Sequence, residues 1–329
     1  MPRPIERYAV IGDCRTAALV GDDGSIDWLC APRFDSASVF AALLGDVEQG
    51  AWLLRPADEV ANASRRYDTD TFTLVTRWTT TAGTVEVIDL MPIGRSEADG
   101  DGRRSDVIRR VRGVSGRVQM VHELRVRFDY AATLPWMRQV GDADAPVLLA
   151  VAGPDALVMR GPRLTAVGHA HRGFFEVDAG DTVDVQLTWF AAHLPVPDPL
   201  DVDAAVNATA SWWREWIAGF LEPGAYDDEV RRSVMVLRLL THEDTGGIVA
   251  AATTSLPEDF GGVRNWDYRY VWLRDAALTL ETLVHHGFTR EAEAWRQWLL
   301  RAIAGDPADV QIMYGLAGER RLSEWEVGS

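Results

Sequence analysis

Apolar and polar residues alternate with a period of two along the first part of the chain. One face of residues 117–128 carries Val118, Met120, His122, Leu124, Val126 and Phe128. Residues 182–190 repeat the alternation, and residues 71–92 contain two such runs around a Thr-Ala-Gly turn. This period predicts half-buried β-strands. Because similar runs recur from about residue 8 to 191, we expect an N-terminal antiparallel β-sandwich over residues 1–200.

The pattern changes after the proline-rich segment PVPDPLD, residues 195–201. From there the apolar residues recur with the spacing of amphipathic helices. We expect a linker over residues 201–224, containing a helix at 204–220, and a helical domain over residues 225–329. Strands first and helices afterwards predict two segregated domains.

Three helices are expected in the helical domain. Asp227 and Asp228 are predicted to cap the first, residues 272–286 to form the second, and Thr289 to cap the third. Gly287 fits the residue that follows a helix end. The inward face of the third helix is expected to carry Ala292, Trp295, Leu299 and Ala302. Short connections between successive helices predict antiparallel hairpins.

Composition excludes several classes of partner and of chemistry. The chain has 329 residues and a net charge of -16, which argues against nucleic acid and anionic membranes as partners. It contains no lysine, so lysine nucleophiles and Schiff bases are excluded. Cys14 and Cys30 are too few for a disulfide framework. The N-terminus lacks the features of a signal peptide and no apolar run is long enough to span a membrane, so we expect a cytoplasmic protein.

The common catalytic and cofactor motifs are missing from the sequence. There is no G-x-S-x-G elbow, P-loop or Rossmann fingerprint. His169 and His171 fit a surface loop better than a metal pair, and His285 and His286 fit a helix end. Residues 21–36 resemble a calcium loop only superficially, and a turn between strands is the preferred interpretation. We therefore expect no cofactor and no metal.

The segment NWDYRYVWLRD, residues 265–275, combines aromatic rings with an adjacent Arg-Asp pair. Its rings are Trp266, Tyr268, Tyr270 and Trp272. Rings can stack on the apolar face of a sugar, while Arg274 and Asp275 hydrogen-bond its hydroxyls. Alternatively, the rings pack between two domains and Arg274 pairs with Asp275. Composition alone leaves both interpretations open.

Four segments resemble glycoside hydrolase family 15, the family of bacterial glucoamylases and trehalases. They are IGDCRTAALVGDDGSIDWLCAPRFDS at 11–36, TTSLPEDFGGVRNWDYRY at 253–270, NWDYRYVWLRDAALTLETL from 265 and QIMYGLAGERRLSEWE at 311–326. The resemblance implies a β-sandwich (a supersandwich), a linker helix and the first helices of an (α/α)6 barrel. It also implies hydrolysis of α-glucosidic bonds in trehalose or α-1,4-glucans from the non-reducing end, with inversion and without a cofactor.

The resemblance also assigns site residues. Arg274 and Asp275 would bind hydroxyls of the terminal glucose, Tyr268 would lie against the same sugar, and Trp272 would also face it as a substrate-binding residue. Trp266, Asp267 and Arg269 match the motif in structural positions, so Asp275 would be a substrate ligand and not the catalytic acid.

The catalytic carboxylates are expected elsewhere. An inverting glycosidase needs two carboxyl groups about 6.5–9.5 Å apart, and the resemblance places both glutamates beyond Ser329. Glu319, Glu324 and Glu326 do not match the catalytic motifs. We therefore expect the 329-residue chain alone to be inactive. The alternatives are an inactive sugar-binding or interaction module and one half of a split enzyme completed by another chain. An oligomer is a further alternative.

Overall fold

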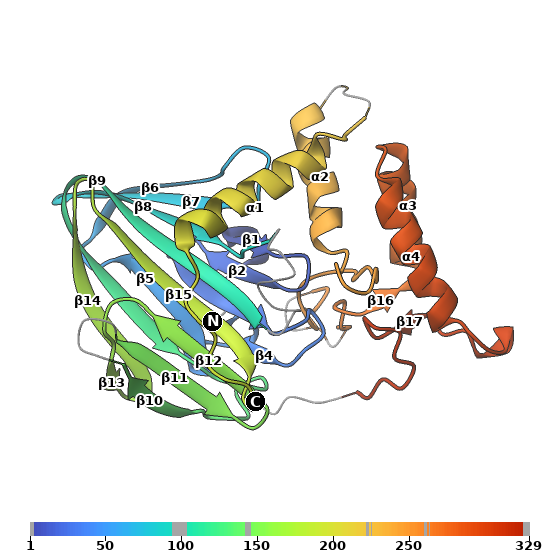
Figure 1. Ribbon diagram of the computed structural model, residues 1–329, viewed down its shortest axis with the longest axis horizontal. Coiled ribbons are helices and arrows are strands. Elements are labelled where there is room, and N and C mark those ends of the chain that lie inside the picture. The colour runs from blue at the N-terminus through green and yellow to red at the C-terminus, as the bar shows by residue number, and fades with distance from the viewer. Residues whose placement is uncertain are drawn as a thin grey trace. The chain divides into compact units, whose positions relative to one another are not determined.

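The computed structural model divides the chain into two compact units (Figure 1). It describes residues 3–93, 104–141, 146–221, 224, 226–259, 262 and 264–324. Unit 1 consists mainly of strands and runs to Trp213, whereas unit 2 holds the helices from Arg214 onward together with Asp13–Ala17 and Arg33–Ser36. No helix in the described ranges is long and apolar enough to cross a membrane.

Unit 1 is built from two sets of antiparallel strands. The first set contains β1 (Tyr8–Gly12), β2 (Ala17–Gly21), β3 (Ser25–Cys30), β4 (Ser38–Phe40), β5 (Ala51–Pro56), β13 (Thr165–Val167) and β14 (Ala170–Asp178). The second contains β6 (Val60–Tyr67), β7 (Leu74–Thr80), β8 (Gly83–Leu90), β10 (Trp136–Val140), β11 (Val147–Ala152), β12 (Asp155–Arg160) and β15 (Thr182–Ala191).

The long strand β9 (Arg104–Arg125) belongs to both sets (Figure 1). Its first half pairs with β8 and β15, and its second half pairs with β5 and β14. The change occurs near Gly116, which has a φ of 66°. A Cβ atom there would lie 2.1 Å from the carbonyl oxygen of Ala82, so only glycine allows this close approach. β9 therefore carries the chain from one sheet into the other.

The core of unit 1 lies between the inner faces of the two sheets. It combines Trp52, Leu54 and Met120 of the first set with Val87 and Leu187 of the second, all buried. This contiguous apolar cluster is the sandwich core that the period-two pattern predicted.

The predicted strands are confirmed in detail. The six alternating residues from Val118 to Phe128 are all buried, although the strand that carries most of them ends at Arg125. Residues 71–92 form the β7–β8 hairpin, in which Thr79 pairs with Thr84. In residues 21–36, a turn separates β2 from β3, as the sequence favoured. Cys14 and Cys30 are buried free thiols.

Four α-helices occur in the described residues of the C-terminal part. They are α1 (Val202–Ile217), α2 (Asp227–Leu239), α3 (Leu273–His285) and α4 (Thr289–Ala302). Two short strands, β16 (Val271–Trp272) and β17 (Met313–Tyr314), pair with one another. Gly287, with a φ of 93°, ends the α3 segment as predicted and leads into α4.

The predicted caps are wrong. Tyr226, with a φ of 70°, precedes α2, and Phe288 precedes α4; neither helix has a side-chain cap. Asp227 and Asp228 instead lie in the first turn of α2, where negative charge complements the helix dipole.

The inward face of α4 agrees with the prediction in part, because Ala302 is buried and Ala292, Trp295 and Leu299 are half-buried. Glu291, Trp298 and Ala302 are its buried residues. Glu291 tolerates burial because it accepts a hydrogen bond from the Trp216 indole at 2.7 Å and lies 3.5 Å from the Arg238 guanidinium. The buried face therefore extends beyond the predicted apolar residues to a paired carboxylate, since an unpaired buried carboxylate would be costly.

Candidate functional site

The sugar-binding candidates lie in a segment held by backbone hydrogen bonds. The N–H of Ser255 donates to the Trp266 carbonyl at 3.1 Å, and the N–H of Ala251 donates to the Tyr268 carbonyl at 2.8 Å. β16 then continues the segment and pairs with β17, with Val271 opposite Tyr314. The segment is therefore fixed by neighbours on both sides before α3 begins.

Tyr268 and Trp272 form a ring pair. Their ring centroids are 5.7 Å apart with an interplanar angle of 40°, and both residues are half-buried. The Trp272 indole N–H donates to the Asp267 carbonyl at 3.2 Å, which orients the ring. Trp272 also occupies the cap position of α3. Two partly exposed rings thus flank the start of this helix, which is the arrangement a stacked ligand needs.

Arg274 and Asp275 occupy the first turn of the same helix. Nη2 of Arg274 donates to both carboxylate oxygens of Asp275, at 3.1 and 3.3 Å. The Arg274 side chain is 76% exposed and that of Asp275 is 30% exposed. A carboxylate at a helix N-terminus is favoured by the dipole, and this charged pair keeps donors and acceptors available to a ligand.

Arg269 has a different environment. It is 3% exposed, and its guanidinium forms a fork with the Asp267 carboxylate, with distances of 3.0 Å from Nε to Oδ1 and 2.6 Å from Nη2 to Oδ2. Nη1 donates to the carbonyl oxygens of Ser36 at 2.8 Å and Phe34 at 3.5 Å. This residue joins the aromatic segment to residues 33–36.

A second group of contacts involves the same early segment. Asp35 accepts both fork hydrogen bonds of Arg33, at 2.8 and 2.6 Å, and the N–H of Leu316 at 3.1 Å. Arg33 also donates to Glu319 at 3.1 Å. These bonds hold the chain that follows β17.

Glu319 has a structural environment. Its carboxylate accepts the Ala317 N–H at 2.9 Å, and its carbonyl accepts the Gly315 N–H at 2.9 Å, so it closes a turn. Glu324 is exposed, and Glu326 lies outside the described residues. The contacts of Glu319 give it a role in the turn that needs no catalytic function.

Of the histidines singled out in the sequence, His169 lies in a turn and His171 in strand β14, and the other two lie at a helix end. His169 has a φ of 60° in the turn between β13 and β14, and burial lowers the pKa of His171. His285 and His286 follow one another at the end of α3, with rings 5.0 Å apart. Within the part of the chain that the structure describes, no group of three or more His, Cys, Asp or Glu side chains is placed to hold a metal.

His242 is a buried histidine that the sequence did not single out. Its Nδ1 accepts the Thr245 N–H at 3.3 Å, which leaves the proton on Nε2. Burial lowers its pKa to about 4; the charge of Asp244 opposes this with a smaller effect, and that of Arg33 adds to it. Since it stays neutral near pH 7 and bonds its own turn, we assign it to the packing of that turn.

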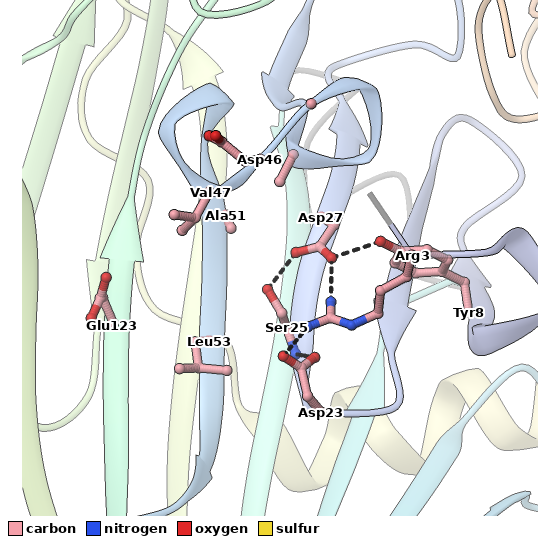
Figure 2. A pocket seen from close by; sticks show the side chains of 12 residues that line it. Arg3, Tyr8, Asp23, Ser25, Asp27, Asp46, Val47, Ala51, Leu53 and Glu123 are labelled. Carbon is pink, nitrogen blue, oxygen red and sulfur yellow. Dashed lines mark hydrogen bonds and ion pairs between the residues drawn. The ribbon is translucent and has the colours of Figure 1, made fainter. Parts of the chain in front are cut away.

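A pocket of about 330 Å³ lies in unit 1, over β3 and β5 (Figure 2). Most of its polar side chains are already bonded to one another, while Asp46 and Glu123 lie outside that group. Arg3 donates to Asp27 at 2.7 Å and to Asp23, and Tyr8 and Ser25 donate to Asp27 at 2.7 and 2.5 Å. Burial, and after it the bond to Asp27, raises the pKa of Tyr8. This closed network gives less reason to expect a ligand than the segment before α3.

Comparison with known proteins identifies the family of this chain. Residues 1–166 match the family described as "Trehalase-like, N-terminal", and residues 224–328 match "Glycosyl hydrolases family 15". The chain belongs to glycosyl hydrolases family 15. Its resemblance to that family, first seen in the aromatic segment, is therefore confirmed.

Individual relatives share about a third of the aligned residues. A trehalase of Mycolicibacterium smegmatis is 34% identical over 98% of this chain and 51% of its own length. Trehalase 1 of Sulfolobus acidocaldarius is 32% identical over 89% of this chain and 48% of its own length. The chain thus spans about half the length of these curated relatives.

A solved structure shows the same fold. A bacterial glucoamylase complexed with acarbose superposes with a TM-score of 0.68 at 10% sequence identity, covering 97% of this chain and 53% of the other. The likeness establishes the arrangement of an antiparallel β-domain followed by helices. It does so independently of sequence, because the identity is so low.

The sequence did not connect residues 33–36 with the aromatic segment. The sequence placed them in a turn of the β-domain, whereas they cluster with unit 2 and contact Arg269 and Leu316. The signal that could have found them was their presence in a segment resembling the family. Periodicity alone contains no information on such a long-range contact.

Proposed function

We propose that this chain carries the glucose-recognising part of a family 15 glycosidase. The single observation that carries the proposal is the ring pair Tyr268–Trp272 directly preceding the exposed Arg274 and its half-buried partner Asp275 at the start of α3. Rings supply stacking surface to the apolar face of a glucose unit, while the charged pair supplies strong hydrogen bonds to its hydroxyls. Asp275 acts in this proposal as a ligand of the sugar.

The proposed reaction is hydrolysis of an α-glucosidic bond from the non-reducing end, with inversion. Trehalose is the preferred substrate because the relatives cited above are named trehalases. α-1,4-Glucans are the second choice, since the structural neighbour is a glucoamylase. The general acid and base are proposed to be glutamates outside this sequence, and the reaction uses no cofactor.

The helices are proposed to be the first of an (α/α)6 barrel. Residues 224–328 match the family 15 description, and the helical part is included in the glucoamylase superposition. Leu278 and Val284 of α3 and Leu300 of α4 are 61%, 48% and 52% exposed. In this proposal further helices cover these side chains, supplied by the same polypeptide or by a complementing chain.

Sugar binding by the chain tests the recognition proposal. Isothermal titration with trehalose, maltose and glucose should detect binding, and Arg274→Ala or Asp275→Asn should weaken it by about 1.5–3 kcal/mol because each removes a charge-assisted hydrogen bond. Arg296→Ala is the matched control, because Arg296 forms a similar exposed ion pair with Glu293 on α4. The control should bind like the wild type.

Two results would contradict the proposal. One is sugar binding that Arg274→Ala and Asp275→Asn leave unchanged. The other is glucose release from trehalose by the pure chain that disappears on changing Glu319 or Glu324, since we expect the chain alone to release none.

A further inference from the structure

Residues 33–36 lie early in the sequence and yet belong to the unit that contains the sugar-binding candidates. Their two points of attachment are separate. The carbonyls of Phe34 and Ser36 accept hydrogen bonds from Arg269, and the carboxylate of Asp35 accepts the N–H of Leu316. The first attachment joins residues 33–36 to the segment that carries the ring pair, and the second joins them to the chain after β17.

The first attachment depends on the shape of the arginine. Its Nε and Nη2 bind the Asp267 carboxylate while Nη1 binds the carbonyls of residues 33–36. A guanidinium can make these bonds together because its donors point outward in a fixed plane, whereas a lysine ammonium is a single point. Its burial at 3% exposure makes each of these bonds structurally important.

Asp267 connects Arg269 to the Trp272 ring, which is predicted to face the sugar. Its carboxylate is held by Arg269, and its carbonyl accepts the Trp272 indole N–H at 3.2 Å. Trp272 in turn lies 5.7 Å from Tyr268, centroid to centroid. The contacts therefore run without a break from the carbonyls of residues 33–36 through Arg269 and Asp267 to the ring pair.

We propose that Arg269 is a positioning residue which uses residues 33–36 as its anchor to set the orientation of the Trp272 ring. The segment from the N-terminal part of the sequence is thereby a component of the recognition apparatus. The effect on sugar affinity rests on the proposed function; the effect on the ring does not.

Indole N–H signals in ¹⁵N–¹H spectra of the full chain test the positioning directly. Trp272→Phe and Trp298→Phe assign the two relevant signals. Arg269→Lys should shift the Trp272 indole signal and speed its exchange with water by about tenfold, because the fork to Asp267 is lost. The Trp298 indole, bonded to the Leu316 carbonyl at 2.8 Å, should stay within about twofold of the wild type.

Asp35→Asn is the matched control. It weakens the bond to the Leu316 N–H and so should perturb the Trp298 indole while leaving Trp272 nearly unchanged. If Arg269→Lys does not fold, Asp267→Asn replaces it as the test, because it keeps the side-chain shape. It should cause a smaller shift of the Trp272 indole signal and a smaller increase in its exchange rate.

The outcomes separate the two proposals. An unchanged Trp272 signal in Arg269→Lys, or in Asp267→Asn if the lysine variant does not fold, overturns the positioning role, as do equal changes at both indoles. In a titration with trehalose, Arg269→Lys should lower affinity at least about fivefold, and Asp35→Asn should lower it less. If the wild type binds no sugar, the proposed function fails while the indole result still judges the positioning role.

Discussion

Each unit contains both buried and exposed arginines, and the two kinds differ in what they bind. In unit 1, Arg109 is fully buried, and it bonds Asp89 at 2.8 Å and the carbonyls of Trp52 and Gly24 at 2.9 and 2.7 Å. In unit 2, Arg269 is buried in a similar way, but the side chain of Arg274 is 76% exposed and that of its partner Asp275 is 30% exposed. The difference indicates that buried arginines hold the architecture, whereas an exposed arginine next to partly exposed rings is available for a ligand.

The largest expected effect is at Arg109. Arg109→Met leaves the Asp89 carboxylate and two carbonyls buried without their donor, so unit 1 should lose about 3–5 kcal/mol of stability. Hydrogen exchange resolved by peptide measures each unit separately. Arg117→Ala removes an exposed pair with Asp178 and should leave exchange near the wild type. Equal loss in the two variants would contradict the distinction between buried and exposed arginines.

The next largest effect is expected in the dependence of each unit's stability on acidic pH. His122 accepts the Trp52 indole N–H at 2.8 Å, and burial, with a smaller effect of Arg109, lowers its pKa from 6.5 to about 3. As the pH falls below 6.5, His122 takes up a proton in the unfolded chain but not in the folded one, so the unfolded state is favoured. Unit 1 should therefore lose about 3 kcal/mol of stability by pH 4.5.

The glutamine variant tests this assignment. His122→Gln keeps an acceptor for Trp52 and should flatten the pH dependence of unit 1 between pH 6.5 and 3. His242→Gln should flatten that of unit 2 over the narrower range from 6.5 to about 4. A pH profile of unit 1 that is the same with and without His122 would show that other groups dominate its acid unfolding.

Two glycines should give a smaller effect, one in each unit. Gly24 and Gly246 have φ values of 85° and 76°, and an added Cβ would lie 2.5 Å from the Leu54 carbonyl and 2.6 Å from the Ala294 carbonyl. Each change to alanine should cost about 1–3 kcal/mol in its own unit. Gly180→Ala is the control, since it shares the positive φ but has open space, and it should cost less.

The smallest stability effect is expected at the proposed site itself. Arg274→Ala should change the free energy of unfolding of unit 2 by less than about 0.5 kcal/mol, because the side chain is 76% exposed. Thermal unfolding followed alongside sugar titration measures both properties in one variant. A large loss of stability would mean that Arg274 is part of the architecture, and the contrast with Arg109 would disappear.

Much of the fold follows from local patterns. The alternation around Val118–Phe128 identified the buried face of β9, and the change of period near residues 195–201 separated strands from helices. The extent of α3 was predicted within one residue at each end. The burial of Glu291 on α4 was not predicted, because it depends on Arg238 and Trp216, which lie far away in the sequence.

The candidate site shows the same division. Tyr268, Trp272, Arg274 and Asp275 could be named from a short motif because they are close in sequence, and their role remains a prediction. The hydrogen bonds between Arg269 and residues 33–36 join positions that are separated by at least 233 residues in the sequence. No local pattern encodes such a contact.

The sequence by itself determined which stretches form strands and helices, and which short motif carries rings beside charges. These properties depend on the spacing of side chains along a few turns or a single strand. The tertiary structure decided which charges are buried and paired, how β9 joins the two sheets at Gly116, and that residues 33–36 hold Arg269. Burial and hydrogen-bond partners arise only when distant segments meet, because they depend on distances between atoms in the folded chain.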